Sequence, residues 1–248
     1  MMLLRCIQND IGKEKRSALP FLLILIPLGT TGAMFLDMFI RYHTYLAGVA
    51  KTKGISSWYI LLKEYHGVLG WGFFFPIFIA VISAAIYHTE YKQNAWKQNL
   101  SLPISRSTAL LSKYIVTCLL SFLLVITNIL GLLVVGKVVG FPEPIDFTLY
   151  GNYVLSQCGA VIGLAAIQNW VSSSSPQFLA SPLVSIFGLI LASVVPKNVS
   201  SFFPYTYTLL GAENVTTAVF GGLLWGLVIL LCSIIEFSKR DIVGGDAQ

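Results

Sequence analysis

The chain has little charge for its length. Asp, Glu, Lys and Arg make up only 11% of its 248 residues, whereas 56% are hydrophobic and the mean hydropathy is +0.77. A soluble domain carries about a quarter charged residues, so this composition argues against a water-exposed globular surface. No polar segment combines clustered basic residues with aromatic ones, so we expect no nucleic-acid partner. The chain is instead expected to fold within a lipid bilayer, in a cell (plasma) membrane.

Residues that would support catalysis or metal binding are also scarce. The four cysteines form no CxxC pair, the three histidines lie far apart, and neither HExxH nor GxSxG occurs. The segment GLLVVGKV at 131–138 approaches a nucleotide-binding P-loop, but Val138 stands where that motif requires a magnesium-binding Ser or Thr. We therefore expect no enzyme activity, no metal site and no cofactor bound directly by this chain.

Acidic residues are nearly absent from the hydrophobic runs. Only Asp37 comes close, and Arg41 follows it at a spacing that places both side chains on one helix face. This spacing favours an ion pair at the membrane surface over a proton or ion site. Proton-coupled transport would normally use carboxylates inside the membrane, which the sequence lacks.

Long apolar runs are what the chain does have. A helix needs about 20 apolar residues to cross the hydrocarbon core, and its backbone groups must be bonded within the helix. The sequence therefore predicts an all-α, polytopic membrane protein that forms a single transmembrane domain over residues 1–248. Serines and a proline at 172–177 disfavour an unbroken helix there and separate the fourth run from the fifth. The six predicted transmembrane helices cover residues 17–40, 67–87, 114–136, 150–171, 178–195 and 215–235.

Lys and Arg residues predict the orientation of these helices. With the N-terminus in the cytoplasm, ten of the sixteen basic residues fall on the cytoplasmic side, as the positive-inside rule requires. Both termini are therefore expected to be cytoplasmic. The first run could also be a signal peptide, because Lys13, Lys15 and Arg16 precede it and small residues occur at 31–33. The apolar pattern continues beyond those small residues, which favours a retained helix.

Two shorter segments have the pattern of amphipathic helices. Near the N-terminus, Leu4, Ile7 and Ile11 repeat at helical spacing, which predicts an interfacial helix on the inner leaflet. In the first outer loop, a stripe at i, i+3, i+4 and i+7 favours a membrane anchor over a substrate contact. The four residues of this stripe are Trp58, Leu61, Leu62 and Tyr65.

Two glycine pairs at GxxxG spacing predict close helix packing. Gly159 and Gly163 lie in the fourth predicted span, and Gly222 and Gly226 lie in the sixth. Small residues at this spacing let helix backbones approach one another in a membrane. Such packing fits either a compact bundle or a dimer face.

The polar stretch at 90–113 interrupts the apolar runs between the second and third spans. Residues 90–102 can form a short helix, on which Trp96 and Leu100 share one face at i and i+4. Pro103 disfavours helix at the residue before it and so ends this segment. Ser105 or Ser107 can then cap the third span. On these residues alone, the apolar face fits a protein partner and the lipid headgroups equally well.

The pattern of this loop resembles that of type-2 ABC exporter permeases. In that family an acid begins the first cytoplasmic loop and a helix follows. An L-x-x-P-x-S-R stretch and a later Lys then lead into the third span. Glu90, Trp96, LSLPISR at 100–106 and Lys113 match this pattern, and the six spans and N-terminal interfacial helix match across the chain. The family often has Gly-Thr in mid-loop, where this chain has QNAW at 93–96.

The resemblance implies a permease that works with ATP-binding partner subunits. It implies two ATP-binding cassette subunits, which hold ATP and Mg, and a second permease that is either identical or a sister subunit. The chain's small size resembles the branch that removes lantibiotic- or bacitracin-like peptide antibiotics from the membrane for self-protection, which implies a hydrophobic peptide substrate. The residues that the resemblance assigns to coupling with the ATPase are Glu90, Trp96, Leu100, Pro103 and Arg106.

A second consequence of the resemblance concerns the segment between the last two spans. FFPYTY at 202–207 looks like the half-inserted outer helices that the family has there. Its aromatic residues would then shape the exit for the peptide, although aromatic residues also form ordinary interfacial belts. These residues are Phe202, Phe203, Tyr205 and Tyr207. Two further interpretations remain open, a non-transporting membrane anchor or sensor subunit and, less favoured, a membrane enzyme.

Overall fold

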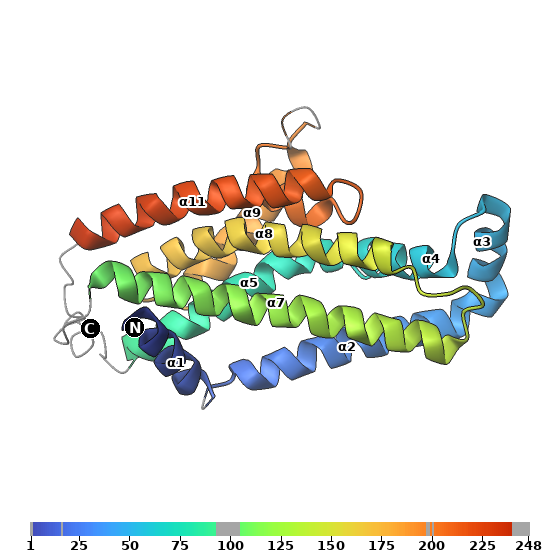
Figure 1. Cartoon of the computed structure of the whole chain (residues 1–248), viewed down its shortest axis with the longest axis horizontal. Coiled ribbons are helices and arrows are strands. Elements are labelled where there is room, and N and C mark those ends of the chain that lie inside the picture. Colours follow the sequence, from blue (N-terminus) through green and yellow to red (C-terminus); the bar gives the residue numbers. More distant parts are fainter. Residues whose placement is uncertain (1, 16, 93–104, 197–198, 200, 240–248) are drawn as a thin grey trace.

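The computed structural model describes residues 2–15, 17–92, 105–196, 199 and 201–239, and no β-strand occurs among them. In Figure 1 long helices lie side by side along the molecule. The described segments are α1 (Met2–Glu14), α2 (Leu19–Arg41), η1 (Tyr42–Leu46), α3 (Ala47–Lys53), α4 (Ser57–Lys63), η2 (Glu64–Val68), α5 (Trp71–Lys92), α7 (Arg106–Val139), α8 (Phe147–Ser174), α9 (Ala180–Val194), η3 (Pro204–Leu209) and α11 (Val215–Lys239).

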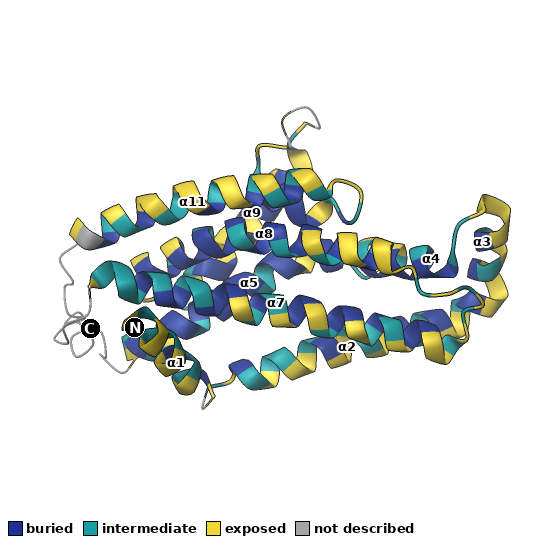
Figure 2. Cartoon of the chain, in the orientation of Figure 1, coloured by how far each residue is buried: buried dark blue, intermediate teal, exposed yellow. Residues whose placement is uncertain are grey.

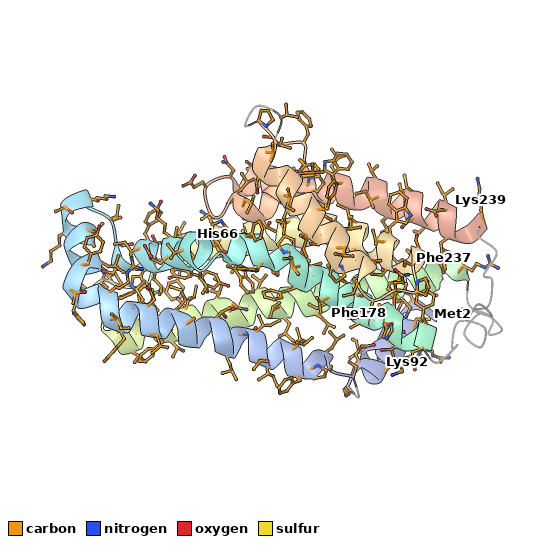
Figure 3. The ribbon with its side chains drawn as sticks, turned by 180° about the vertical axis from the view of Figure 1, so that it is seen from behind. Met2, His66, Lys92, Phe178, Phe237 and Lys239 are labelled. Carbon is orange, nitrogen blue, oxygen red and sulfur yellow. The ribbon has the colours of Figure 1, made fainter. Side chains whose placement is uncertain are left out.

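Two ends of the bundle are used below as reference points. The proximal end contains Met2, Lys92, Phe237 and Lys239, which lie together in Figure 3. The distal end contains α3, α4 and η2, on the opposite side of the molecule in Figure 1. The helix α7 extends from one end to the other, and α2 runs beside it to the distal end.

Five helical segments are long and apolar enough to cross a membrane, which confirms an all-helical, multi-pass chain. They are Leu19–Lys53, Trp71–Lys92, Arg106–Val139, Phe147–Ser174 and Val215–Phe237. The fifth predicted span instead forms α9, whose 15 residues rise about 22 Å, less than the roughly 30 Å of the hydrocarbon core. The count of six complete crossings therefore stays a prediction.

Several helix boundaries differ from the predicted ones. The first span continues through a π-helical turn, η1, into α3, and the helix ends only at Gly54, whose φ of +62° is left-handed. The third span begins at Arg106 rather than 114, because the Ser105 hydroxyl caps it by accepting a hydrogen bond from the Thr108 backbone N–H. The predicted break at 172–177 is confirmed, since α8 ends at Ser174 and α9 begins at Ala180.

The stripe predicted to anchor the first outer loop in the membrane lies inside the protein. Trp58 and Leu61 are fully buried, and Leu62 and Tyr65 are nearly so. The Trp58 indole N–H donates to the backbone carbonyl of Glu143 at 3.0 Å. The anchor prediction was therefore wrong, because helical spacing reveals an apolar face and does not distinguish lipid from the interior of the same chain.

Apolar side chains cover much of the outer surface of the long helices. Figure 2 shows exposed residues along α2, α9 and α11, and many of them are large and hydrophobic. Phe39, Phe187 and Phe220 are each at least 63% exposed. This surface suits the hydrocarbon core, because lipid tails are as apolar as these side chains.

The helices α8 and α11 pack closely through the predicted glycine pairs. Gly163 faces Gly222, and a side chain at Gly222 would collide with the backbone carbonyl of Gly159. A Cβ on Gly226 would lie 3.0 Å from the carbonyl oxygen of Ile162. These glycines thus serve packing within one chain.

Candidate functional site

A cluster of buried charges joins three helices at the proximal end. Glu90, in the last turn of α5, is 2% exposed, and Lys113, in the second turn of α7, is also 2% exposed. One oxygen of Glu90, Oε1, lies 2.9 Å from the Lys113 Nζ and 2.9 Å from the Lys13 Nζ. A single carboxylate oxygen therefore bridges lysines from α1 and α7.

A second carboxylate completes this arrangement. The Asp10 Oδ1 lies 3.6 Å from the Lys113 Nζ, and the hydroxyl of Ser112 donates to the Asp10 Oδ2 at 2.6 Å. The Lys113 ammonium also lies 5.4 Å from the ring centre of Tyr87, within the range of a cation–π contact. We call Asp10, Lys13, Glu90 and Lys113 the acid–base cluster.

The cluster turns the charged face of α1 toward the protein. Asp10 and Glu14 are buried, whereas Leu4 is 65% exposed and Ile7 and Ile11 pack partly against the core. The exposed apolar residue fits the predicted interfacial helix, whereas the two acidic residues face the bundle. The helix is thus attached to the bundle through ion pairs and hydrogen bonds as well as through Ile7 and Ile11.

Glu14 extends the polar contact beside the cluster. The hydroxyl of Ser17 donates to the Glu14 Oε2 at 2.7 Å. Burial raises the pKa of the Glu14 carboxyl above its usual value, and the hydrogen bond from Ser17 opposes that effect.

The burial of the cluster and the balance of its charges determine how it contributes to stability. Two acids and two bases compensate one another, and a buried charge is tolerated only when it is paired in this way. Removing one partner leaves an uncompensated charge and costs about 3–5 kcal/mol. The cluster is therefore a specific, breakable link between α1, α5 and α7.

The residues predicted for coupling lie on both sides of the segment 93–104. Glu90 belongs to the acid–base cluster, and Arg106 is half-buried at the start of α7. Trp96, Leu100 and Pro103 lie outside the described residues. The Glu90 carboxylate is buried and contacts Lys13 and Lys113 of its own chain.

Asp10, Lys13 and Ser112 were missed by sequence reasoning. Asp10 and Lys13 are 80 and 77 residues from Glu90 in the sequence, so no local spacing links them to it. The only available signal was the alternation of acid and base along one helix at positions 10, 13 and 14. That pattern is equally typical of a solvated helix face.

The aromatic segment near the distal end differs from its predicted form. Its described part forms one 3₁₀ helix, η3, rather than half-inserted α-helices. Tyr205 and Tyr207 are buried, and the Tyr205 hydroxyl accepts a hydrogen bond from the Gln168 Nε2 at 2.9 Å. Phe203 is half-buried, and Phe202 is 72% exposed. Two of the four predicted exit residues therefore lie within the bundle.

The predicted ion pair of the first span is confirmed, with an additional partner. The Arg41 guanidinium lies 2.8 Å from Asp37 and 3.0 Å from Glu64. The near-P-loop segment at 131–138 lies wholly within α7, where Gly136 packs against the Trp58 ring. A continuous helix cannot form the phosphate-binding loop that this motif requires.

Comparison with known proteins identifies the family. Residues 6–193 match the family model described as ABC-2 family transporter protein, and this match includes every member of the acid–base cluster. A search of curated proteins finds no significant match. Because the match spans most of the 248 residues, the chain belongs to the ABC-2 transporter family and is a multi-pass membrane permease subunit that works with an ATP-binding cassette subunit.

Proposed function

We propose that this permease is an exporter subunit in which the segment 93–104 receives the movement of the ATP-binding partner. The observation that carries this proposal is the acid–base cluster. It links the last turn of α5 to the second turn of α7, and these two helices flank the segment. A displacement of the segment would reach both helices through a buried ion pair rather than through a loose linker.

The coupling residues then act in two ways. Trp96 and Leu100 would contact the partner subunit, and Pro103 and Arg106 would fix the start of α7. Glu90 would act as a positioning residue, because its carboxylate is bonded to Lys13 and Lys113. ATP and Mg²⁺ would be bound by the partner subunits.

The proposed assembly contains two permeases and two ATP-binding subunits. The second permease would be a copy of this chain or a sister subunit. The proximal end would face the cytoplasm together with both termini, in agreement with the distribution of basic residues. The apolar surface of α9 supports a sixth membrane segment, since Leu183, Phe187 and Val194 are all more than 60% exposed.

The proposed cargo is a hydrophobic peptide antibiotic of the lantibiotic or bacitracin type, removed from the membrane for self-protection. The resemblance of the loop and the small size of the chain support this choice. Phe202 and Phe203 would contact the departing peptide near the distal end, whereas Tyr205 and Tyr207 would support them from inside the bundle.

The coupling proposal is tested with the double variant Trp96→Ala and Leu100→Ala. Each side chain would contribute about 1.5–3 kcal/mol if buried against the partner, so losing both should weaken docking at least about 100-fold. The measurements are co-purification of the ATP-binding subunit and ATP hydrolysis at matched membrane levels. The matched control is Phe220→Ala with Leu224→Ala, which removes two exposed apolar side chains from α11, away from the segment.

The two variants separate the possible outcomes. Normal docking and export in the Trp96/Leu100 variant would show that the segment is only a lipid-surface anchor. Susceptibility tests with a panel of peptide antibiotics, with and without the transporter, test the cargo. Absence of protection against every peptide, together with normal docking, would contradict the cargo and favour an anchor or sensor subunit.

A further inference from the structure

A pocket of about 300 Å³ opens at the distal end, away from the acid–base cluster. It lies between α4 and η2, the first turns of α8, and the residues that follow η3. Its volume equals that of about ten water molecules in the liquid, at the lower limit for small-molecule sites. Its lining residues from η2 and from the stretch after η3 come just before two membrane-length helices in the sequence, since α5 begins at Trp71 and α11 at Val215.

His66 forms the polar part of the pocket wall. Figure 3 shows it toward the distal end, well away from Lys92 and Lys239. Its Nε2 lies 3.1 Å from the backbone carbonyl oxygen of Leu209, and its Nδ1 lies 3.0 Å from the Tyr153 hydroxyl. A carbonyl oxygen can only accept, so Nε2 carries the proton.

The protonation state of His66 determines which hydrogen-bonding groups the pocket wall presents to a ligand. Burial lowers the pKa of the imidazole, so the ring is neutral at physiological pH. With its proton on Nε2, the ring accepts at Nδ1 the hydrogen bond that the Tyr153 hydroxyl donates. Both ring nitrogens are therefore already bonded within the protein. Leu62, Leu149 and Leu210 add aliphatic side chains to the lining, and Tyr59 adds an aromatic ring.

Among the described residues that line this pocket, the charged ones lie at its edge. Lys63 and Glu213 both line it and both are exposed, so they present opposite charges to a ligand that enters. The chemistry of the site is thus an apolar interior with one cationic and one anionic group at its mouth.

We propose that this pocket binds one large apolar side chain of a peptide that carries an acidic and a basic group beside it. A phospholipid headgroup fits less well, because it is polar throughout and the inner wall has no free hydrogen-bonding group on His66 to receive it. The inference that such a peptide is cargo rests on the proposed function. Binding itself requires neither ATP nor the partner subunit, so the two proposals can fail separately.

The test uses the full-length chain in lipid nanodiscs and the probe acetyl-Lys-photoleucine-Glu-amide. Photoleucine carries a diazirine on a leucine-like side chain, and its crosslinks are located by mass spectrometry. We expect crosslinks in the pocket segments 59–67 and 209–213. An excess of acetyl-Lys-Leu-Glu-amide should suppress them, whereas acetyl-Lys-Ser-Glu-amide should compete about tenfold less well or worse.

Two pairs of variants test the interior and the edge of the pocket. Gly67 lines the pocket and has open space where a Cβ would lie, so Gly67→Trp should occupy the pocket without disturbing the fold. We expect at least about tenfold less crosslinking than in the matched control Gly67→Ala. Lys63→Gln should reduce it up to about fivefold, while Lys53→Gln, at an exposed lysine at the end of α3, should leave it unchanged.

The proposal is overturned by any of three results obtained in nanodiscs. These are crosslinks spread along the apolar surface, equal competition by the leucine and serine peptides, or equal crosslinking in Gly67→Trp and Gly67→Ala. Crosslinking that occurs in detergent and vanishes in nanodiscs would show that a lipid occupies the pocket, and would also contradict the proposal. A thermal unfolding curve for each variant confirms that it is folded.

Discussion

At the proximal end, Glu90 lies between the ammonium groups of Lys13 and Lys113, whereas at the distal end Trp58 packs edge-on against the rings of Phe141 and Tyr150. Both arrangements are buried, but a substitution in one destabilises the protein in a different way from a substitution in the other. An ion pair loses most of its stability when one charge is removed, because the other stays buried. A cluster of rings loses stability roughly in proportion to the apolar area that is removed.

This difference suits the proposed division of labour. The proximal end has to transmit a displacement between helices, and a single bridging carboxylate ties three of them together. The distal end has to keep its shape, and neutral hydrogen bonds such as that from the Tyr150 hydroxyl to the Trp58 carbonyl serve this purpose.

The largest expected effect follows from Lys113→Met. This change keeps the bulk of the side chain but removes a charge that faces both Glu90 and Asp10. We expect a loss of about 3–5 kcal/mol in the free energy of unfolding. Thermal unfolding in nanodiscs measures it, with the exposed Lys92→Met as the control. A second substitution, Glu90→Gln, should recover part of the loss, and a simple sum of the two effects would contradict the proposed pairing.

A smaller loss in the free energy of unfolding is expected from a substitution between the two ends, where α8 meets α11. Gly222→Ala would place a Cβ against the Gly159 carbonyl, and overpacking of this kind costs about 1–3 kcal/mol. The control is Gly29→Ala in α2, where the new Cβ would meet no atom within 4 Å. Equal unfolding temperatures for both variants would show that these helices separate more easily than their contact indicates.

The distal end should respond more weakly to the loss of one polar group. Tyr153→Phe removes the hydroxyl that donates to the His66 Nδ1, and the expected loss is about 1 kcal/mol. Tyr45→Phe serves as the control, because Tyr45 is 62% exposed. A loss as large as that of Lys113→Met would remove the contrast between the two ends.

Acidification from pH 7.5 to 5 should affect the two ends in opposite directions. The lowered pKa of His66 means that its contribution to stability is present above its ordinary value of 6.5 and is lost as the pH falls through the folded value. The raised pKa of Glu14 means that its contribution is present below its ordinary value of 4.5 and is lost as the pH rises through the folded value.

Hydrogen exchange resolved by segment would measure both changes. We expect faster exchange around η2 and slower exchange around the end of α1 as the pH falls, after correction for the intrinsic pH dependence of exchange. These are the smallest effects predicted here. His66→Gln and Glu14→Gln should each abolish the response at its own end only, and a response that survives both substitutions would point to other groups.

The local features of the fold could be predicted from the sequence, and the contacts between distant segments could not. Asp37 and Arg41 pair as predicted because one helical turn separates them. The Ser105 cap was recognisable for the same reason. The burial of the Trp58 stripe was not, since an apolar face looks the same whether protein or lipid covers it.

The candidate site shows the same limit. Glu90 was identified through the pattern of its loop, but its partners were not, because Lys13 approaches it from 77 residues away. Charged residues on a short helix usually face water, so nothing in the sequence indicated that Asp10 and Glu14 would be buried. Only the docking of α1 against α7 makes their burial visible.

The most direct test of the central claim compares Lys113→Met with Gly222→Ala in the assembled transporter. Conditions are chosen so that equal fractions of both variants are folded, and ATP hydrolysis and peptide export are then measured together. If the acid–base cluster positions the segment 93–104 for coupling, Lys113→Met will hydrolyse ATP without export, whereas Gly222→Ala will keep the normal ratio of export to hydrolysis. Equal ratios in the two variants would contradict the account, because the cluster would then contribute only to stability.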